Sequence, residues 1–253
     1  APIIPAEFGR FVYSLFGESA DYEDRCLLLQ ETIGYLLIQS DLNVQKVVAY
    51  DGASRAGKGV ILSLIQEMLG AGKRGTFSFS DMDNDKVKSS FRQHDVVIDT
   101  DAKPTARANS KAVIGFMNKV VSGEPVSVPL LYSQQPWEGV LKTKMIIGCN
   151  GIPTMLDDSG ATTNRFIALY FDRTFAGRED RGLLNRLRPE LQQIADWALE
   201  GLKRLVANDG RFTMPATTVE ALEQLKEANQ PMDTFIDEWL DFGADYKSHV
   251  RAL

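Results

Sequence analysis

The stretch VVAYDGASRAGKGVIL constrains the fold of this chain more than any other part of its sequence. It contains GASRAGKG, residues 52–59, which fits the GxxxxGK pattern of phosphate-binding loops. An apolar strand, Lys46–Tyr50, precedes the loop, and apolar residues from Val60 to Met68 follow it at helical spacing. Because such a unit points backbone N–H groups and a helix N-terminus at phosphate oxygens, the sequence predicts a phosphate cradle. The alternative is a glycine-rich turn with an exposed lysine.

The predicted ATP site covers this loop and the first helical residues. Lys58 is expected to reach the β- and γ-phosphates. Gly59 stands where such loops usually carry the Ser or Thr whose hydroxyl ligates Mg²⁺, and Val60 does not restore that hydroxyl. Since Mg²⁺ accepts water ligands, we expect ATP and Mg²⁺ as cofactors, with an acid elsewhere anchoring the metal shell. The predicted ATP-binding residues are Gly52, Ala53, Ser54, Arg55, Ala56, Gly57, Lys58, Gly59 and Val60.

Two acids at the end of the predicted strand His94–Asp101 are candidates for that anchoring role. Asp99 follows three apolar residues, so its carboxylate is expected at the carboxyl end of the strand, where open α/β sheets bind ligands. Asp101 lies two residues further on. One acid would hold the metal shell, and the other would orient or deprotonate the attacking water. The alternative is a strand that merely ends in Asp.

Two further polar residues lie beside predicted strands. Asn150 ends the strand Lys144–Asn150 and is a candidate for holding the attacking water, although an Asn before Gly151 also suits a simple turn. Arg165, at the start of the strand Asn164–Phe171, is a candidate arginine finger that would stabilise charge on the transferred phosphoryl group. Its alternative is a surface salt bridge.

Composition limits the classes of function. The chain has 253 residues, with 28 Lys and Arg against 34 Asp and Glu, so its formal charge is −6 and any contact with nucleic acid must be local. Two distant cysteines and two histidines argue against a disulfide framework and a His-rich metal cluster, and favour a reduced, cytosolic setting. No apolar run reaches membrane-spanning length, and the first residues lack the pattern of a signal peptide. Since the chain does not begin with Met, we expect a fragment of a longer one.

The order of predicted elements indicates an α/β fold with a central, mostly parallel sheet. Strands and helices alternate first, and helices alone follow from Pro189. We therefore expect an N-terminal helical segment at residues 1–45, an ATPase core at 46–175 and a C-terminal helical annex at 176–253. Besides the elements above, the pattern predicts helices at Asp21–Gln39, Ser110–Val121, Val219–Ala228 and Met232–Phe242, and a hairpin or extended loop within Glu124–Leu141.

The order of these motifs resembles the superfamily-three helicases. The phosphate loop, the apolar strand with acids, VSGEPVSV, the strand with Asn and IPTMLDDSGATTNRF follow one another as in that family. The resemblance is strongest to the helicase half of phage, plasmid and poxvirus primase-helicases, and it spans Tyr22 to Leu240. It implies an AAA+-like P-loop core, and a homohexameric ring that encircles single-stranded DNA, shares ATP sites between neighbours and translocates 3′→5′.

The resemblance also assigns roles to particular residues. It makes Lys58 the phosphate-binding lysine, Asp99 the acid on the metal, Asn150 the sensor, and Arg165 a finger that reaches the neighbouring subunit. The family usually has adjacent acids in its second motif, whereas Thr100 stands here at the second position. The choice of Asp99 or Asp101 as general base therefore stays open.

The same resemblance makes the segment from Gly123 to Leu141 the pore loop that grips DNA. Family members usually carry Lys, Arg or His at its tip, and this chain has none between Glu124 and Lys142. We therefore expect aromatic rings to stack on the bases and lysines to contact the phosphates. The alternative for the lysines is that they are simply solvated residues at the start of a strand. The predicted DNA-binding residues are Tyr132, Trp137, Lys142 and Lys144.

These features together predict the motor domain of a replicative DNA helicase, part of a primase-helicase encoded by a phage or plasmid. It would work in the cytoplasm of a bacterial or archaeal host, with single-stranded DNA and copies of itself as partners. A primase or polymerase domain on the same longer chain is a further expected partner, and no membrane is. Two alternatives stay open: a nucleotide-gated DNA-binding ring with blunted hydrolysis, and a small-molecule P-loop kinase.

Overall fold

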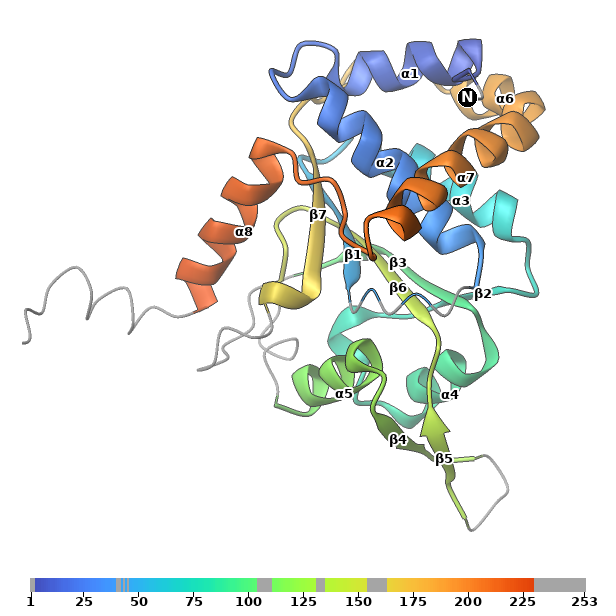
Figure 1. Ribbon diagram of the computed structural model, residues 1–253, viewed down its shortest axis with the longest axis vertical. Helices are drawn as coiled ribbons and strands as arrows, with labels where there is room; N and C mark the ends of the chain where they lie inside the picture. The colour runs from blue at the N-terminus through green and yellow to red at the C-terminus, as the bar shows by residue number, and fades with distance from the viewer. Residues whose placement is uncertain are drawn as a thin grey trace, which may run out of the picture.

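The molecule is built around a central five-stranded sheet, which is seen in the computed structural model (Figure 1). The strand order is β2-β3-β6-β1-β7, and every neighbouring pair is parallel. The strands are β1 (Val47–Gly52), β2 (Arg74–Thr76), β3 (Val96–Ala102), β6 (Lys144–Cys149) and β7 (Phe166–Phe171). The structure describes residues 3–39, 42, 44, 46–103, 111–130, 135–153 and 163–229.

Helices cover both faces of this sheet (Figure 1). The α-helices are α1 (Ala6–Phe16), α2 (Tyr22–Leu37), α3 (Lys58–Leu69), α4 (Asp85–Gln93), α5 (Lys111–Ser122), α6 (Leu183–Leu187), α7 (Leu191–Ala207) and α8 (Ala216–Asn229). Short 3₁₀ turns are η1 (Phe79–Asp81), η2 (Thr163–Arg165) and η3 (Arg188–Glu190). The predicted α/β fold with a central parallel sheet is confirmed, and the arrangement is consistent with a P-loop-like core.

The two faces have separate apolar cores because side chains alternate along each buried strand. In β1, Val48 and Tyr50 join the core under α1, α2, α3 and α7. Val47 and Ala49 join the opposite core, which contains α5 and the hairpin strands β4 (Pro125–Val128) and β5 (Trp137–Val140). Because β1 is buried on both faces, its sequence from Val47 to Tyr50 is a continuous apolar run and does not alternate with polar residues.

Two helices that lie far apart in the sequence pack closely against each other. Helices α2 and α7 lie side by side, and glycines permit the close approach: a Cβ on Gly34 would lie 2.2 Å from the Ala198 carbonyl oxygen. The buried Glu31 carboxylate accepts hydrogen bonds from Arg204 Nε at 2.7 Å and from the Thr213 amide at 2.7 Å. The α2–α7 pair therefore forms one rigid support beneath the sheet.

Several elements differ from those that the sequence predicts. Helices α1, α4 and α6 and strand β2 are not predicted, whereas the predicted helix Met232–Phe242 lies outside the described residues. Strand β1 continues to Gly52, and Arg165 belongs to η2 just before β7. The hairpin is confirmed as antiparallel β4 and β5. Within the described chain, no helix is both long enough and apolar enough to cross a bilayer.

Candidate nucleotide-binding site

The loop between β1 and α3 has a backbone that requires its glycines. Gly52 has φ +141° and Gly57 has φ +92°, a region that other residues rarely adopt. A Cβ on Gly52 would lie 2.1 Å from the Phe171 carbonyl oxygen, and one on Gly57 would lie 2.5 Å from Leu15. Both the backbone conformation and the close packing therefore require glycine at the two glycine positions of GxxxxGK. The strand–loop–helix geometry that the motif predicts is present, with α3 beginning at Lys58.

Lys58 lies at the centre of the site. Its Nζ donates hydrogen bonds to the Gly52 carbonyl, to the Ala53 carbonyl at 2.8 Å and to Asn150 Oδ1 at 2.9 Å. Because β6 is the parallel neighbour of β1, residues 92 apart in the sequence meet at the same edge of the sheet. Burial lowers the pKa of the lysine, and the negative charges of Asp51 and Asp101 oppose that shift.

The predicted metal acid, Asp99, lies on β3, the other neighbour of β6. Its carboxylate accepts the Phe79 amide at 2.8 Å and the Asp101 amide at 3.1 Å. Burial raises the pKa of Asp99, and these two backbone hydrogen bonds partly offset that rise. The β3–β6 register shifts between Asp99 and Ala102, which leaves Thr100 and Asp101 exposed. Asp101 pairs with Lys103 at 3.1 Å.

The carboxylates near the loop suit a magnesium ion that is held mainly by the phosphates of a bound nucleotide. Among the residues that the structure describes, no group of three His, Cys, Asp or Glu side chains is arranged to bind a metal. Mg²⁺ usually keeps several waters and takes one or two carboxylates together with nucleotide phosphates. A single half-buried carboxylate such as Asp99 fits that coordination.

Gly59 has open space around it. A Cβ built on this residue meets no atom within 4 Å, and the hydroxyl of Ser63, one turn along α3, bonds to the Gly59 carbonyl at 2.8 Å. The absence of a Ser or Thr side chain at residue 59 is therefore not imposed by packing.

We expect Gly59→Thr to retain nucleotide affinity and to lower the Mg²⁺ concentration needed for half-maximal ATP hydrolysis, because the new hydroxyl can replace a metal-bound water. Titration of hydrolysis with Mg²⁺ measures the effect. The matched control is Gly57→Thr, which forces a side chain into φ +92° and against Leu15, and is expected to lose nucleotide binding. Loss of nucleotide binding in Gly59→Thr as well would mean that the loop needs glycine at both positions.

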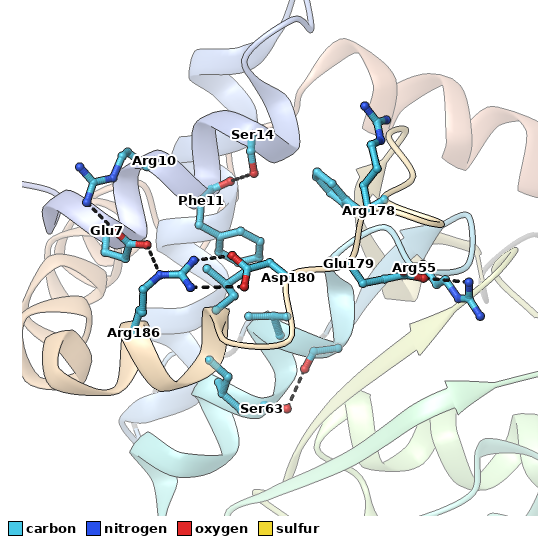
Figure 2. Close-up of a pocket in the computed structure, with 16 residues that line it drawn as sticks. Glu7, Arg10, Phe11, Ser14, Arg55, Ser63, Arg178, Glu179, Asp180 and Arg186 are labelled. Carbon is cyan, nitrogen blue, oxygen red and sulfur yellow. Dashed lines mark hydrogen bonds and ion pairs between the residues drawn. The ribbon is translucent and has the colours of Figure 1, made fainter.

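A pocket of about 560 Å³ adjoins the loop (Figure 2). Its apolar wall comes from three separate segments, and its polar rim includes the ion pair of Arg55 and Glu179 at 2.8 Å. The Phe175 amide bonds to the Arg55 carbonyl at 3.0 Å, which ties the segment before α6 to the phosphate loop. Figure 2 shows Phe11 of α1 directed into the pocket. The apolar lining residues are Phe11, Val60, Phe175, Leu183 and Leu184. No sequence motif indicates this pocket.

Arg165 does not lie with the other predicted catalytic residues. It precedes β7, whose first residue pairs with Val47 and whose last residue, Phe171, pairs with Gly52. The six residues of β7 separate Arg165 from its own phosphate loop by about 17–20 Å of extended chain. Arg165 is close to Lys46, whose pKa is lowered by burial and also by the charge of Arg165.

The predicted DNA-binding residues have different surroundings. Tyr132 lies outside the described residues. Trp137 is half-buried and packs against the core beneath the hairpin, with its ring over Gly139 of the same strand. Lys142 is exposed just before β6.

The prediction that Lys144 contacts DNA phosphates is wrong, because the structure buries this side chain. Lys144 is buried, and its Nζ donates to the carbonyls of Tyr35 and Ile38 at the C-terminal end of α2. The ammonium also lies 4.2 Å from the centre of the Tyr35 ring. Burial lowers its pKa to about 8. The cation therefore stabilises a helix terminus, where the helix dipole favours positive charge.

A matched pair of variants tests this correction. Lys144→Ala leaves two carbonyls without their partner and is expected to lower the free energy of unfolding by about 1–3 kcal/mol. It should not change DNA affinity once the variant is folded. Lys142→Ala, at an exposed position, is expected to leave stability unchanged and to weaken DNA binding at low salt. Denaturant melts and DNA titrations at fixed salt distinguish the two, and the reverse pattern would restore Lys144 as a DNA contact.

Comparison with family models and with curated proteins finds no match. Among solved structures, two of the NrS-1 C-terminal region in its apo form match with a TM-score of 0.63 at 13% and 12% identity. A third structure of the same region matches with a TM-score of 0.59 at 13% identity. Each match covers 89% of this chain and 52% of the other, so the chain spans about half of the region that it resembles. At this identity the likeness shows a shared fold.

Proposed function

We propose that this chain is the ATP-hydrolysing motor domain of a replicative DNA helicase, belonging to a primase-helicase of the superfamily-three type. The observation that carries the proposal is the hydrogen bond of 2.9 Å from Lys58 Nζ to Asn150 Oδ1. It joins a glycine-rich phosphate loop to a polar group at the end of the adjacent strand. A phosphate-binding lysine beside a polar group that can orient water is the arrangement that phosphoryl transfer requires.

The residues divide the chemistry between them. Loop amides and Lys58 would hold the phosphates, and Asp99 would anchor the Mg²⁺ shell that neutralises them. Asn150 would hold the attacking water in line, with Asp99 or Asp101 accepting its proton. Asp101 is the more exposed of the two acids.

The pocket beside the loop supports a nucleotide as the ligand. Its volume of about 560 Å³ is in the range of small-molecule sites, and its lining includes two aromatic residues, Phe11 and Phe175, of the kind that pack against a planar base. The pocket lies next to Gly57, Gly59 and Val60, so a base in it would leave the phosphates at the loop. An inorganic anion alone would not need this apolar wall.

The position of Arg165 supports a ring. A finger at the N-terminal end of β7 is remote from the phosphate loop of its own chain, at the carboxyl ends of the strands. It is better placed to serve the site of a neighbouring copy. A hexamer around single-stranded DNA, as in the helicases that the sequence resembles, uses this geometry at every interface.

The test is ATP turnover of the purified chain with and without single-stranded DNA, together with its mass in solution and strand displacement on a forked duplex. We expect DNA to stimulate turnover, and an ATP analogue with DNA to raise the mass to that of a ring. Turnover that is indifferent to DNA in a monomer would favour a small-molecule kinase. An absence of both ATP binding and turnover would end the proposal.

The second candidate is a nucleotide-gated DNA-binding ring with blunted hydrolysis. Two observations favour it: Gly59 supplies no hydroxyl for the metal, and Thr100 occupies the position of the family's second acid. Tight ATP binding with very slow turnover, and DNA affinity that depends on bound ATP, would select this function over the motor.

A further inference from the structure

Asp51 is a buried carboxylate at the junction of the two segments that form the site. It is the penultimate residue of β1, and its Oδ1 accepts the Gly52 amide at 2.7 Å and the Gly151 amide at 2.6 Å. The thiol of Cys149 approaches the same oxygen at 3.6 Å. One carboxylate oxygen therefore holds the first residue of the phosphate loop and the residue that follows Asn150.

We propose that Asp51 is a positioning residue for ATP hydrolysis, which fixes Asn150 against Lys58 by clamping the two backbone segments that carry these residues. The inference rests on the proposed function, because it assigns to Asp51 a part in the same reaction. It goes beyond the phosphate-loop pattern, since that pattern begins only at Gly52.

The backbone ladder makes such a clamp necessary. The last β1–β6 pair is Asp51 with Cys149, and beyond it Gly151 turns away with φ +104°. Asn150 thus lies past the end of the ladder that holds β6 to β1. The side chain of Asp51 extends the connection past this pair, because its Oδ1 accepts the amide of Gly151, two residues beyond Cys149. Since a displacement of about 1 Å at a reacting group can cost about 100-fold in rate, this connection bears directly on turnover.

The contacts form a closed circuit. Lys58 Nζ bonds to the Gly52 carbonyl and to Asn150 Oδ1, while Asp51 Oδ1 bonds to the amides of Gly52 and Gly151. The polar groups of the two segments are therefore joined on both sides. The charge of Asp51 also raises the pKa of Lys58 against the effect of burial, which helps to keep the lysine protonated.

The experiment compares Asp51→Ala with Asp51→Asn in the full chain. Alanine removes the acceptor, and we expect kcat for ATP to fall by about 10- to 100-fold while the Kd for ATP changes by less than about threefold. Asparagine keeps an oxygen acceptor and is expected to recover most of kcat near neutral pH. Because the Asn variant lacks the charge that supports the Lys58 pKa, its activity should decline at a lower alkaline pH than that of the wild type.

A control variant separates positioning from general loosening. Thr32→Val removes the buried hydrogen bond of 2.9 Å between this side chain of α2 and the hydroxyl of Tyr50. Tyr50 precedes Asp51 on β1, so its side chain lies on the other face of the sheet, in the core under α2. The Thr32→Val variant is expected to lower the melting temperature and to leave kcat unchanged. If Asp51→Ala does not fold, Asp51→Glu replaces it: the charge stays, the oxygen is displaced by one methylene, and kcat should fall with ATP affinity retained.

The outcomes are distinct. Wild-type kcat in folded Asp51→Ala, or equal damage in the Ala and Asn variants, would overturn the positioning role while leaving the proposed function standing. A parallel loss of ATP affinity and kcat in the Ala variant would also overturn it, since the clamp would then serve binding. If the wild type neither binds nor hydrolyses ATP, the proposed function fails, and the role of Asp51 fails with it.

Discussion

Replacing Lys58 with alanine is expected to abolish ATP hydrolysis while the fold stays intact. The ammonium is held by two loop carbonyls and Asn150 at the phosphate end of the site, so its loss removes the charge that would stabilise the transferred phosphoryl group. Loss of one such preorganised group typically costs about 100- to 1,000-fold in rate. Phosphate release measures the effect, and circular dichroism reports on the fold.

The matched control is Lys73→Ala, an exposed lysine in the turn before β2. It removes the same charge from the protein far from the phosphate loop and is expected to keep wild-type turnover. Wild-type turnover in Lys58→Ala, with an unchanged spectrum, would end the interpretation of residues 52–59 as a phosphate cradle. Equal losses in both lysine variants would indicate a general effect of net charge.

The central unit of the fold is predictable because its signals are local. Strand β1, its loop and helix α3 follow from an apolar run, a glycine pattern and helical spacing that lie within one continuous stretch, Val47–Met68. The sequence predicts that Lys58 and Asn150 lie near each other, because parallel strands bring their carboxyl ends to one edge of the sheet. Their direct hydrogen bond depends on β6 being the immediate neighbour of β1, which no local pattern specifies.

Of the elements that are not predicted, some lack a local signal and one contains it. Helix α4 buries only Phe91, so apolar spacing hardly marks it, and its start depends on the Asn84 side chain accepting the Lys86 amide at 2.9 Å. Strand β2 has three residues. Helix α1 carries apolar residues at helical spacing, so its sequence does contain the signal. The carboxylate of Glu190, far along the chain, caps α1 by accepting the amides of Glu7 and Phe8.

Long-range packing also decides the roles of single residues. Lys144 has the sequence context of a solvated strand entry, yet the carbonyls of Tyr35 and Ile38 enclose its ammonium. Asp51 looks like an ordinary polar residue before a loop, and only the fold brings Gly151 to it. The pocket beside the phosphate loop is lined by α1, α3 and the chain from Phe175 into α6, so only the three-dimensional fold brings its walls together.

Arg165→Ala is expected to nearly silence ATP hydrolysis and to spare ATP binding. An arginine supplied to a phosphoryl-transfer site is worth about 10³–10⁵ in rate. The strand β7 separates this arginine from the loop of its own chain, so the loss should appear in the site of the neighbouring subunit. The control is Arg173→Ala, beyond the other end of β7, where the side chain pairs with Glu18 at the surface and should be dispensable.

Mixing two inactive variants tests whether the finger acts between subunits. Lys58→Ala subunits have an inactive phosphate loop and an intact Arg165, whereas Arg165→Ala subunits have an intact phosphate loop and lack the arginine finger. If each site combines the loop of one copy with the finger of the next, a random equal mixture gives about one interface in four with both parts intact. Activity should therefore reappear above that of either variant alone and be greatest near equal ratios. If subunits exchange and no activity returns at any ratio, Arg165 acts within its own chain or is not a finger, and the ring mechanism loses its main structural support.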